Sequence, residues 1–385
     1  MKIESVDVWL VEGIRYNWTL LRITTDTGLT GVGESTNWPG SPLVYHATQH
    51  LAESIIGEDP RRIDYIWTKL YRDFNWQGPT GTMLCAMSGI DMALLDIKAK
   101  MLGVPVYELL GGTFRTEILL YANYWFTLAD HTPESYAHYA QEVVQQHGFT
   151  GLKFDPFAHT SYLFGDDLST NLMLTPAQQD LSYNIVAAVR EAAGDDVQLM
   201  IETHAMLNMP DAIRMAKRME PLNITWYEEP AGPESPQVLR YLSEKIPIPL
   251  CVGERHYTRW MFRALLDEFA VDYIMPDITR CGGPSELKRI ATLAETSNIQ
   301  VAPHNPNGPL STIASAHVCA TIPNFFRQEY MFNDVPWRDE IIDHPLDIRD
   351  GHFVLSDRPG WGVDLVPEVM EAHPGIVKKR KGFYI

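Results

Sequence analysis

Leu199-Met200-Ile201-Glu202-Thr203-His204 runs from three apolar residues into a carboxylate and, after one threonine, an imidazole. Side chains alternate between the two faces of a strand, so Glu202 and His204 lie on the same face, one pleat apart. Such a pair at a strand end fits a metal ligand beside an acid or base. It fits a solvated polar rim equally well, and the surrounding segments decide between the two.

After Gly112 the chain repeats a short apolar strand, a loop and an amphipathic helix. This alternation predicts a parallel βα barrel over residues 113–350, and an open doubly wound sheet is the alternative. The predicted strands span residues 118–126, 151–155, 198–204, 224–229, 249–254, 273–277, 299–304 and 325–330.

Residues 1–112 have a different pattern, which predicts an α+β unit. Segments 1–11 and 17–36 alternate with period two around the turn Asp26-Thr27-Gly28, and helical periodicity follows from about residue 41. The Gly31-x-Gly33 pair lacks the third glycine and the helix of a dinucleotide-binding loop. We expect the tail, residues 351–385, to return to this unit as part of one capping domain.

Composition excludes several classes of partner. The 385 residues carry a formal net charge of −18, which opposes binding to nucleic acid or to an anionic membrane. Four widely spaced cysteines indicate reduced thiols rather than disulfides or a zinc site. The start MKIESVDVWLV has no signal-peptide pattern, and no apolar run reaches the length of a membrane span. These features predict a cytoplasmic globular protein.

Seven successive predicted strands end in polar residues. In βα barrels the carboxyl ends of the strands form the active-site face. One charged strand end is ordinary, whereas seven at one face are difficult to explain as a solvated rim. The endings are Lys153-Phe154-Asp155, Glu202-Thr203-His204, Glu228-Glu229-Pro230, Gly253-Glu254-Arg255, Pro276-Asp277, Pro303-His304-Asn305 and Gln328-Glu329.

Glu202, Glu228 and Glu254 are spaced 26 residues apart, on three adjacent strands. Three carboxylates that converge in a barrel mouth repel one another unless a cation lies between them, and oxygen ligation with open positions suits Mg²⁺. The competing interpretation is that they pair with Arg255, Lys153 or other basic residues.

Two histidines flank the three glutamates. His304 ends the seventh strand and Asp277 the sixth, so the carboxylate can orient the imidazole and raise its pKa toward working pH, which makes it a base. A lone histidine is more often structural, but two beside three carboxylates favour catalysis. The sequence has no phosphate-binding loop, no Gly-x-Ser-x-Gly elbow and no His-Glu-x-x-His motif.

With these residues in place, the chain resembles the enolase superfamily, specifically the acid-sugar dehydratases of its mandelate racemase branch. The motifs are SGIDMALLDIKAKMLGVPVYELLGG, the three carboxylate strand ends, the segment from Pro276 to Gly283, PHNPNGP and the closing PGWGVDL. The resemblance covers essentially the whole chain. It implies a modified (β/α)7β barrel with an α+β capping domain and a homo-oligomeric state.

The resemblance also implies roles for individual residues. Glu202, Glu228 and Glu254 are expected to bind Mg²⁺, His304 with Asp277 to be the base, and Glu329 to hydrogen-bond near the substrate carboxylate. The aromatic loop Tyr16–Trp18 and the segment after Glu34 are expected to be lids that set specificity. Among the strand ends, Lys153 and Asp155 are further substrate-binding candidates, together with Tyr16 and Trp18.

Two departures from the family pattern favour a dehydratase over a racemase. Asp155 stands where many relatives have a second base, and the expected ligand Glu202 stands where aspartate is commoner. His204 follows Glu202, as in galactonate dehydratases, and is the natural acid for a leaving hydroxide. We therefore expect Mg²⁺-dependent dehydration of a sugar acid, such as galactonate or gluconate, to a 2-keto-3-deoxy acid through an enediolate. The alternatives are a cycloisomerase of an anhydro sugar acid, or a related isomerase or racemase, that uses the same enediolate. A non-catalytic metal-dependent binding protein is a third possibility.

Overall fold

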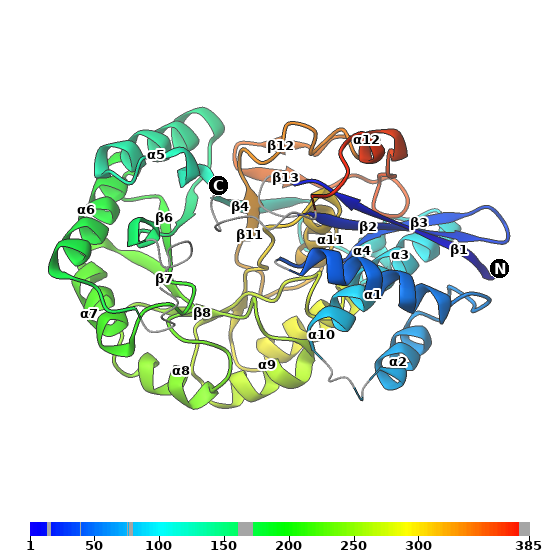
Figure 1. Ribbon diagram of the computed structural model, residues 1–385, viewed down its shortest axis with the longest axis horizontal. Helices are drawn as coiled ribbons and strands as arrows, with labels where there is room; N and C mark the ends of the chain where they lie inside the picture. The colour runs from blue at the N-terminus through cyan, green and yellow to red at the C-terminus, as the bar shows by residue number, and fades with distance from the viewer. Residues whose placement is uncertain (14–16, 39, 75, 77–79, 161–171, 377–385) are drawn as a thin grey trace.

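A computed structural model describes residues 1–13, 17–38, 40–74, 76, 80–160 and 172–376 (Figure 1). The helices and strands divide into an N-terminal group, a barrel and a C-terminal tail. None of the helices in these ranges is both long enough and apolar enough to span a membrane.

The N-terminal group is an antiparallel sheet covered by helices. Its three strands pair in the order β1-β2-β3, and the long helix α3 packs against β3 and β2. Glycine permits this close approach, because a side chain at Gly33 would overlap the carbonyl oxygen of Gly89 on α3. The Gly31-x-Gly33 pair is therefore a helix-packing feature. The elements are β1 (Ile3–Val11), β2 (Trp18–Thr25), β3 (Thr30–Glu34), α1 (Ser41–Glu53), α2 (Ile63–Asp73), α3 (Thr82–Leu102) and α4 (Val106–Leu109).

The middle of the chain forms the predicted (β/α)7β barrel. Neighbouring strands pair in parallel from β4 through β10 in chain order, and β11 closes the ring by pairing in parallel with β4. Val301 at the end of β10 also bridges to Phe325, just before β11. The strands are β4 (Glu117–Asn123), β5 (Gly151–Phe154), β6 (Gln198–Glu202), β7 (Ile224–Glu228), β8 (Leu250–Val252), β9 (Tyr273–Ile274), β10 (Gln300–Val301) and β11 (Gln328–Met331).

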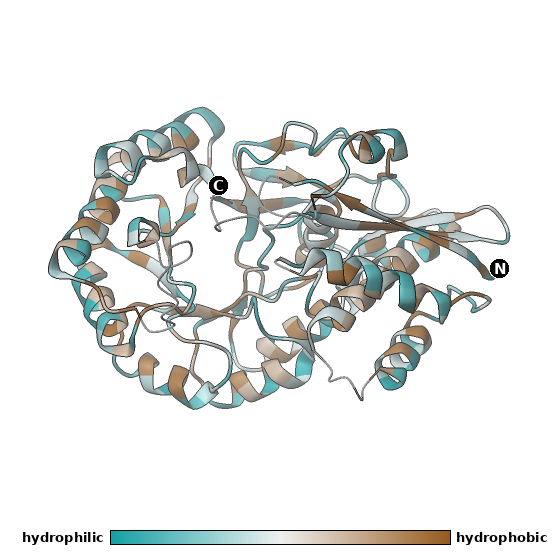
Figure 2. Cartoon of the chain, viewed as in Figure 1, coloured by the Kyte–Doolittle hydropathy of each residue, from teal (hydrophilic) through white to brown (hydrophobic). Residues whose placement is uncertain are grey.

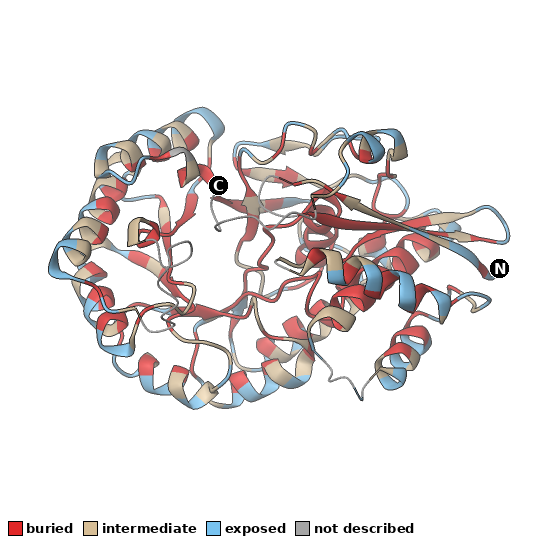
Figure 3. Cartoon of the chain, viewed as in Figure 1, coloured by how far each residue is buried: buried red, intermediate tan, exposed pale blue. Residues whose placement is uncertain are grey.

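Within the described residues, seven α-helices connect successive barrel strands and cover the outside of the ring. Their apolar faces turn inward and their polar faces outward, as Figures 2 and 3 show for the helices at the left of the molecule. The helices are α5 (Pro133–His147), α6 (Pro176–Ala193), α7 (Met209–Met219), α8 (Pro236–Ser243), α9 (Thr258–Asp267), α10 (Pro284–Glu295) and α11 (Pro309–Ala320).

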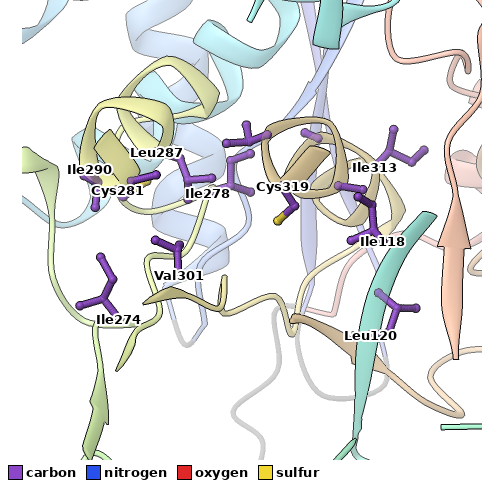
Figure 4. Close-up of a cluster of buried hydrophobic side chains, with 14 of the residues drawn as sticks. Ile118, Leu120, Ile274, Ile278, Cys281, Leu287, Ile290, Val301, Ile313 and Cys319 are labelled. Atoms are coloured by element: carbon purple, nitrogen blue, oxygen red, sulfur yellow. The ribbon is translucent and has the colours of Figure 1, made fainter. Parts of the chain in front are cut away.

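The hydrophobic core is continuous between the barrel wall and its helices. In Figure 4, Leu287 and Ile290 of α10 and Ile313 of α11 gather with Ile274 and Val301 from the strands. A separate cluster fills the inside of the barrel below the strand ends, so the barrel is a packed core rather than a pore. Its members are Tyr121, Met200, Trp226, Cys251, Met275 and Ala302.

The C-terminal tail contacts both parts of the molecule. It begins with the hairpin of β12 (Ile348–Arg349) and β13 (His352–Val354), and β13 pairs with the barrel strand β4 rather than with the N-terminal sheet. The chain then crosses to the N-terminal group, where the backbone N–H of Trp361 donates to Asp96 and α12 (Pro367–Ala372) lies against β1.

Candidate active site

The three glutamates predicted from their spacing lie together at the carboxyl ends of adjacent strands. Glu202 ends β6, Glu228 ends β7 and Glu254 follows β8. One carboxylate oxygen from each lies within 4.8 Å of those of the other two. The parallel strands produce this convergence, since β6 and β7 pair in a register that places Glu202 directly beside Glu228.

Burial and mutual repulsion perturb the three carboxylates. Glu228 is fully buried, and burial together with the charge of Glu202 raises its pKa well above the usual value. For Glu202 and Glu254 burial also acts to raise the pKa, but the charges of His204 and His304 respectively, together with Lys153 and the hydrogen bond at each carboxylate, lower both values. The ionised carboxylates thus depend on positive charge close by in this buried site.

Lys153 lies between two of the strand-end carboxylates. Its Nζ donates to Glu228 Oε1 at 2.7 Å and to Glu329 Oε1 at 2.8 Å, and it lies 3.8 Å from Glu202 Oε2. The competing interpretation of the sequence was that basic residues pair with the glutamates, and for Lys153 the structure confirms this pairing. Arg255 instead pairs with Glu229, at 2.5 Å, outside the cluster of three.

His304 forms the predicted pair with Asp277. Its Nδ1 lies 2.8 Å from Asp277 Oδ2, and its Nε2 lies 2.9 Å from Glu254 Oε2. Burial acts to lower the pKa of His304, but the charges of Glu254 and Glu329 and the bond to Asp277 raise it to about 9. Asp277 Oδ1 is held by the backbone N–H and the hydroxyl of Thr279, both at 2.8 Å.

His204 occupies the other side of the three glutamates. Its Nδ1 lies 3.3 Å from Asp155 Oδ2, and its Nε2 lies 4.0 Å from Glu202 Oε2. The backbone N–H of His204 donates to Glu202 Oε1 at 2.6 Å. His204 and Ala205 both have positive φ, 47° and 55°, a conformation that non-glycine residues rarely adopt. This tight turn directs the imidazole back over the strand end.

Several residues predicted to bind substrate are placed differently. Trp18 is not in an exposed loop: it begins β2, its side chain is 1% exposed, and Arg338 lies over its ring. The Trp18 ring is thus packed inside the protein, a placement that does not favour the predicted role in a lid. Tyr16 lies outside the described residues. Asp155 is fully buried, with its carboxylate directed at His204 and at the backbone N–H of Phe157.

Glu329 is also fully buried, and its carboxylate is bonded on both oxygens. Oε1 accepts from Asn123 Nδ2 at 2.6 Å and from Lys153, while Oε2 accepts from the backbone N–H of Asn305 at 2.6 Å. His304 Nε2 lies 3.9 Å away. Glu329 thus contacts both Lys153 and the segment that carries His304.

Two residues that contact Asp277 were not predicted as site residues from the sequence. Arg280 is buried, with Nε 3.4 Å from Asp277 Oδ2 and Nη1 4.0 Å from Glu254 Oε1. Asn307 Nδ2 donates to both oxygens of Asp277 at 3.1 Å. Both residues lie in segments that the sequence had marked only as family motifs, and a polar residue in a loop carries no signal of the direction of its side chain.

The N-terminal group reaches this face of the barrel through the end of β3. Glu34 caps α11 by accepting from the backbone N–H groups of Gly308 and Ser311, at 2.7 and 2.9 Å. Two residues later, the carbonyl of Thr36 accepts from the hydroxyl of Thr279, beside Asp277. The segment after Glu34, predicted to be a lid, thus lies against the base side of the site.

Comparison with known proteins agrees with this arrangement. Residues 14–111 match the model of the mandelate racemase/muconate lactonizing enzyme N-terminal domain, and residues 135–369 match the enolase C-terminal domain-like model. The D-xylonate dehydratase of Haloferax volcanii is 33% identical over 97% of this chain and 89% of its own. A D-galactonate dehydratase family member of Streptomyces bingchenggensis is 34% identical, over 94% and 91%.

A solved structure shows that the likeness extends to the fold. The 3,6-anhydro-D-galactonate cycloisomerase of Zobellia galactanivorans superposes with a TM-score of 0.85 at 27% identity, over 97% of this chain and 99% of that one. The domain matches, the barrel and the placement of the three glutamates lead to one conclusion: the chain belongs to the mandelate racemase branch of the enolase superfamily.

Proposed function

We propose that this protein is a Mg²⁺-dependent hydro-lyase that dehydrates a sugar acid to a 2-keto-3-deoxy acid. The observation that carries the proposal is the placement of two histidines about the three glutamates. Nε2 of His304 faces Glu254, and Nε2 of His204 faces Glu202, at opposite ends of the row. Elimination of water from a sugar acid needs one group to take the α-proton and another to protonate the leaving hydroxyl.

Glu202, Glu228 and Glu254 would hold the Mg²⁺ ion. The donor set fits, because all three ligands are carboxylate oxygens and hard divalent cations prefer oxygen. The raised pKa of Glu228 supports the same role, since a divalent cation beside this carboxylate would favour the ionised form that binds the metal. When bound, the ion supplies the charge that stabilises an enediolate.

The protein's own residues would carry the proton transfers. His304 takes the α-proton on Nε2 while Asp277 holds Nδ1, and His204 gives a proton to the 3-hydroxyl as it leaves. Lys153 and Glu329, bonded to each other, fix the floor of the site beside Glu228. General acid and base steps of this kind contribute about 10²–10⁴-fold each.

The direct test is a screen of an acid-sugar library with the purified protein and Mg²⁺. We expect at least one aldonate to yield a 2-keto acid that reacts with semicarbazide, and NMR to identify it as a 2-keto-3-deoxy acid. A non-catalytic binding protein would give neither product nor deuterium incorporation at the α-carbon in D2O. That result with every acid in the library would reject the proposal.

Cycloisomerisation of an anhydro sugar acid is a second candidate, favoured by the likeness to the Zobellia cycloisomerase. It would begin with the same removal of the α-proton but would open a ring without releasing water. Mass spectrometry of the product separates the two candidates, because the cycloisomer has the same mass as its substrate whereas the dehydration product is lighter by one water.

A further inference from the structure

We propose that Asp155 is a positioning residue for His204, so that the site contains two Asp–His pairs rather than one. This inference rests on the proposed dehydration. It changes the meaning of Asp155, which the sequence suggested as a substrate ligand in the place of a missing second base.

The two pairs are built in the same way. In each, the aspartate follows one barrel strand and the histidine follows the next: Asp155 comes after β5 and His204 after β6, and Asp277 comes after β9 and His304 after β10. In each, aspartate Oδ2 faces histidine Nδ1, at 3.3 Å in the first pair and 2.8 Å in the second.

The other oxygen of each aspartate is fixed locally. Asp155 Oδ1 accepts from the backbone N–H of Phe157 at 2.8 Å, and Asp277 Oδ1 accepts from the backbone N–H of Thr279 at 2.8 Å. Both bonds reach two residues ahead, which is the Asx-turn geometry. Each carboxylate is thereby anchored with one oxygen and presents the other to its histidine.

Burial separates this role from that of a substrate ligand. Asp155 is fully buried, whereas the side chain of His204 is 15% exposed. The imidazole, rather than the carboxylate, is therefore the accessible member of the pair. A fully buried carboxylate does not suit the role of a second base or a substrate ligand.

The chemical consequence concerns which nitrogen carries the transferable proton. A carboxylate at Nδ1 keeps that nitrogen protonated and directs Nε2 toward the glutamates. In the elimination, the Nε2–H proton moves to the 3-hydroxyl oxygen, the C3–O bond breaks with its electron pair on that oxygen, and water leaves. The electrons of the enediolate form the C2–C3 double bond, and the imidazolium becomes a neutral imidazole that keeps its Nδ1–H on Asp155.

The test compares Asp155→Asn with the matched variant Asp277→Asn, using the sugar acid that the wild-type protein dehydrates fastest. In D2O, Asp155→Asn should exchange the α-proton within about twofold of the wild-type rate, while dehydration falls by about 10²-fold, the size of a general-acid contribution. Asp277→Asn should lose exchange and dehydration together.

A better leaving group provides the readout that a merely structural role would not give. Fluoride leaves without a proton, so the 3-deoxy-3-fluoro analogue of the same sugar acid should release fluoride equally fast with the wild-type protein and Asp155→Asn. Unchanged dehydration in Asp155→Asn would overturn the inference. So would a parallel loss of exchange, dehydration and fluoride release, which indicates a general structural role.

A measurement on the wild-type protein does not depend on turnover or on the folding of Asp155→Asn. Histidine ¹⁵N–¹H correlation spectra, assigned by comparison with His204→Asn, should show His204 protonated at Nδ1, and an unprotonated Nδ1 would overturn the inference. Absence of any turnover by the wild-type protein would instead reject the proposed function, while the spectrum would still report on the contact between Asp155 and His204.

Discussion

Nδ1 of His304 lies 2.8 Å from Oδ2 of Asp277, although 27 residues separate the two in the chain. The contact arises because β9 and β10 are parallel neighbours whose carboxyl ends meet at one face of the barrel. The carboxylate fixes the imidazole so that Nε2 points at Glu254. This relationship underlies the assignment of His304 as the base.

His304→Asn should abolish both α-proton exchange and dehydration, because both begin with proton removal by Nε2. We expect a loss of at least ~10²-fold in each rate, the lower end of a general-base contribution. The measurement is deuterium incorporation by NMR together with 2-keto acid formation. Dehydration at the wild-type rate in this variant would refute the assignment.

His204→Asn should separate the two reactions. His204 lies beside Glu202 at the opposite end of the glutamate row from His304, so its loss leaves the base in place. We expect continued deuterium exchange and a loss of dehydration of ~10²-fold or more. If exchange disappears together with dehydration, His204 is not simply the acid.

Glu254→Gln should weaken Mg²⁺ binding. An ion that binds the folded state alone stabilises the wild-type protein by about 2.7 kcal/mol at a concentration 100 times its Kd. Thermal unfolding with and without Mg²⁺ measures this effect, which should shrink in the variant. Glu229→Gln is the matched control, because Glu229 is a buried neighbour that pairs with Arg255 rather than joining the three ligands. It should keep the response to Mg²⁺, and an equal loss in both variants would contradict the predicted ligand set.

Gly33→Ala should destabilise the fold through packing rather than through the chemistry of the site. The added methyl would overlap the carbonyl oxygen of Gly89, so β3 and α3 would have to separate. Overpacking of this kind costs about 3 kcal/mol in the free energy of unfolding. Gly28→Ala has no atom within 4 Å of the new methyl and only its φ of +80° to oppose it, so its cost should be about 1 kcal/mol. Urea unfolding measures the loss of unfolding free energy in each variant. Equal losses would refute the packing argument.

His317 should make the fold sensitive to acid. Burial lowers its pKa to about 3, and its Nδ1 already accepts from the backbone N–H of Tyr107. The unfolded chain binds a proton at this histidine below about pH 6.5, whereas the folded protein binds it only when the pH falls to about 3. The stability that the neutral histidine provides is therefore complete above about pH 6.5 and is lost as the pH falls from there toward 3.

The variant His317→Asn keeps an acceptor for Tyr107 but cannot titrate. Between about pH 7.5 and pH 5, the wild-type protein should lose about 2 kcal/mol more unfolding free energy than this variant. Urea unfolding at the two pH values measures the difference. Identical losses would show that His317 does not contribute to acid sensitivity.

The sequence by itself determined the barrel and the identity of most polar residues at its mouth. Each short apolar strand ending in a charged residue is a local signal, and a parallel barrel brings all such ends to one face whatever the details of packing. For that reason the cluster of Glu202, Glu228 and Glu254 followed from spacing alone, and the structure places their oxygens together. The pair of His304 and Asp277 followed in the same way, from adjacent strands.

Only the tertiary structure decided what each polar group faces. Asp155 was read as a substrate ligand but lies beneath His204, and Trp18 was read as part of a lid but is packed inside. The direction of a side chain after a strand depends on the following turn, such as the positive φ at His204, and on which long-range neighbour fills the space. Those contacts join residues far apart in the chain, so no local pattern of sequence specifies them.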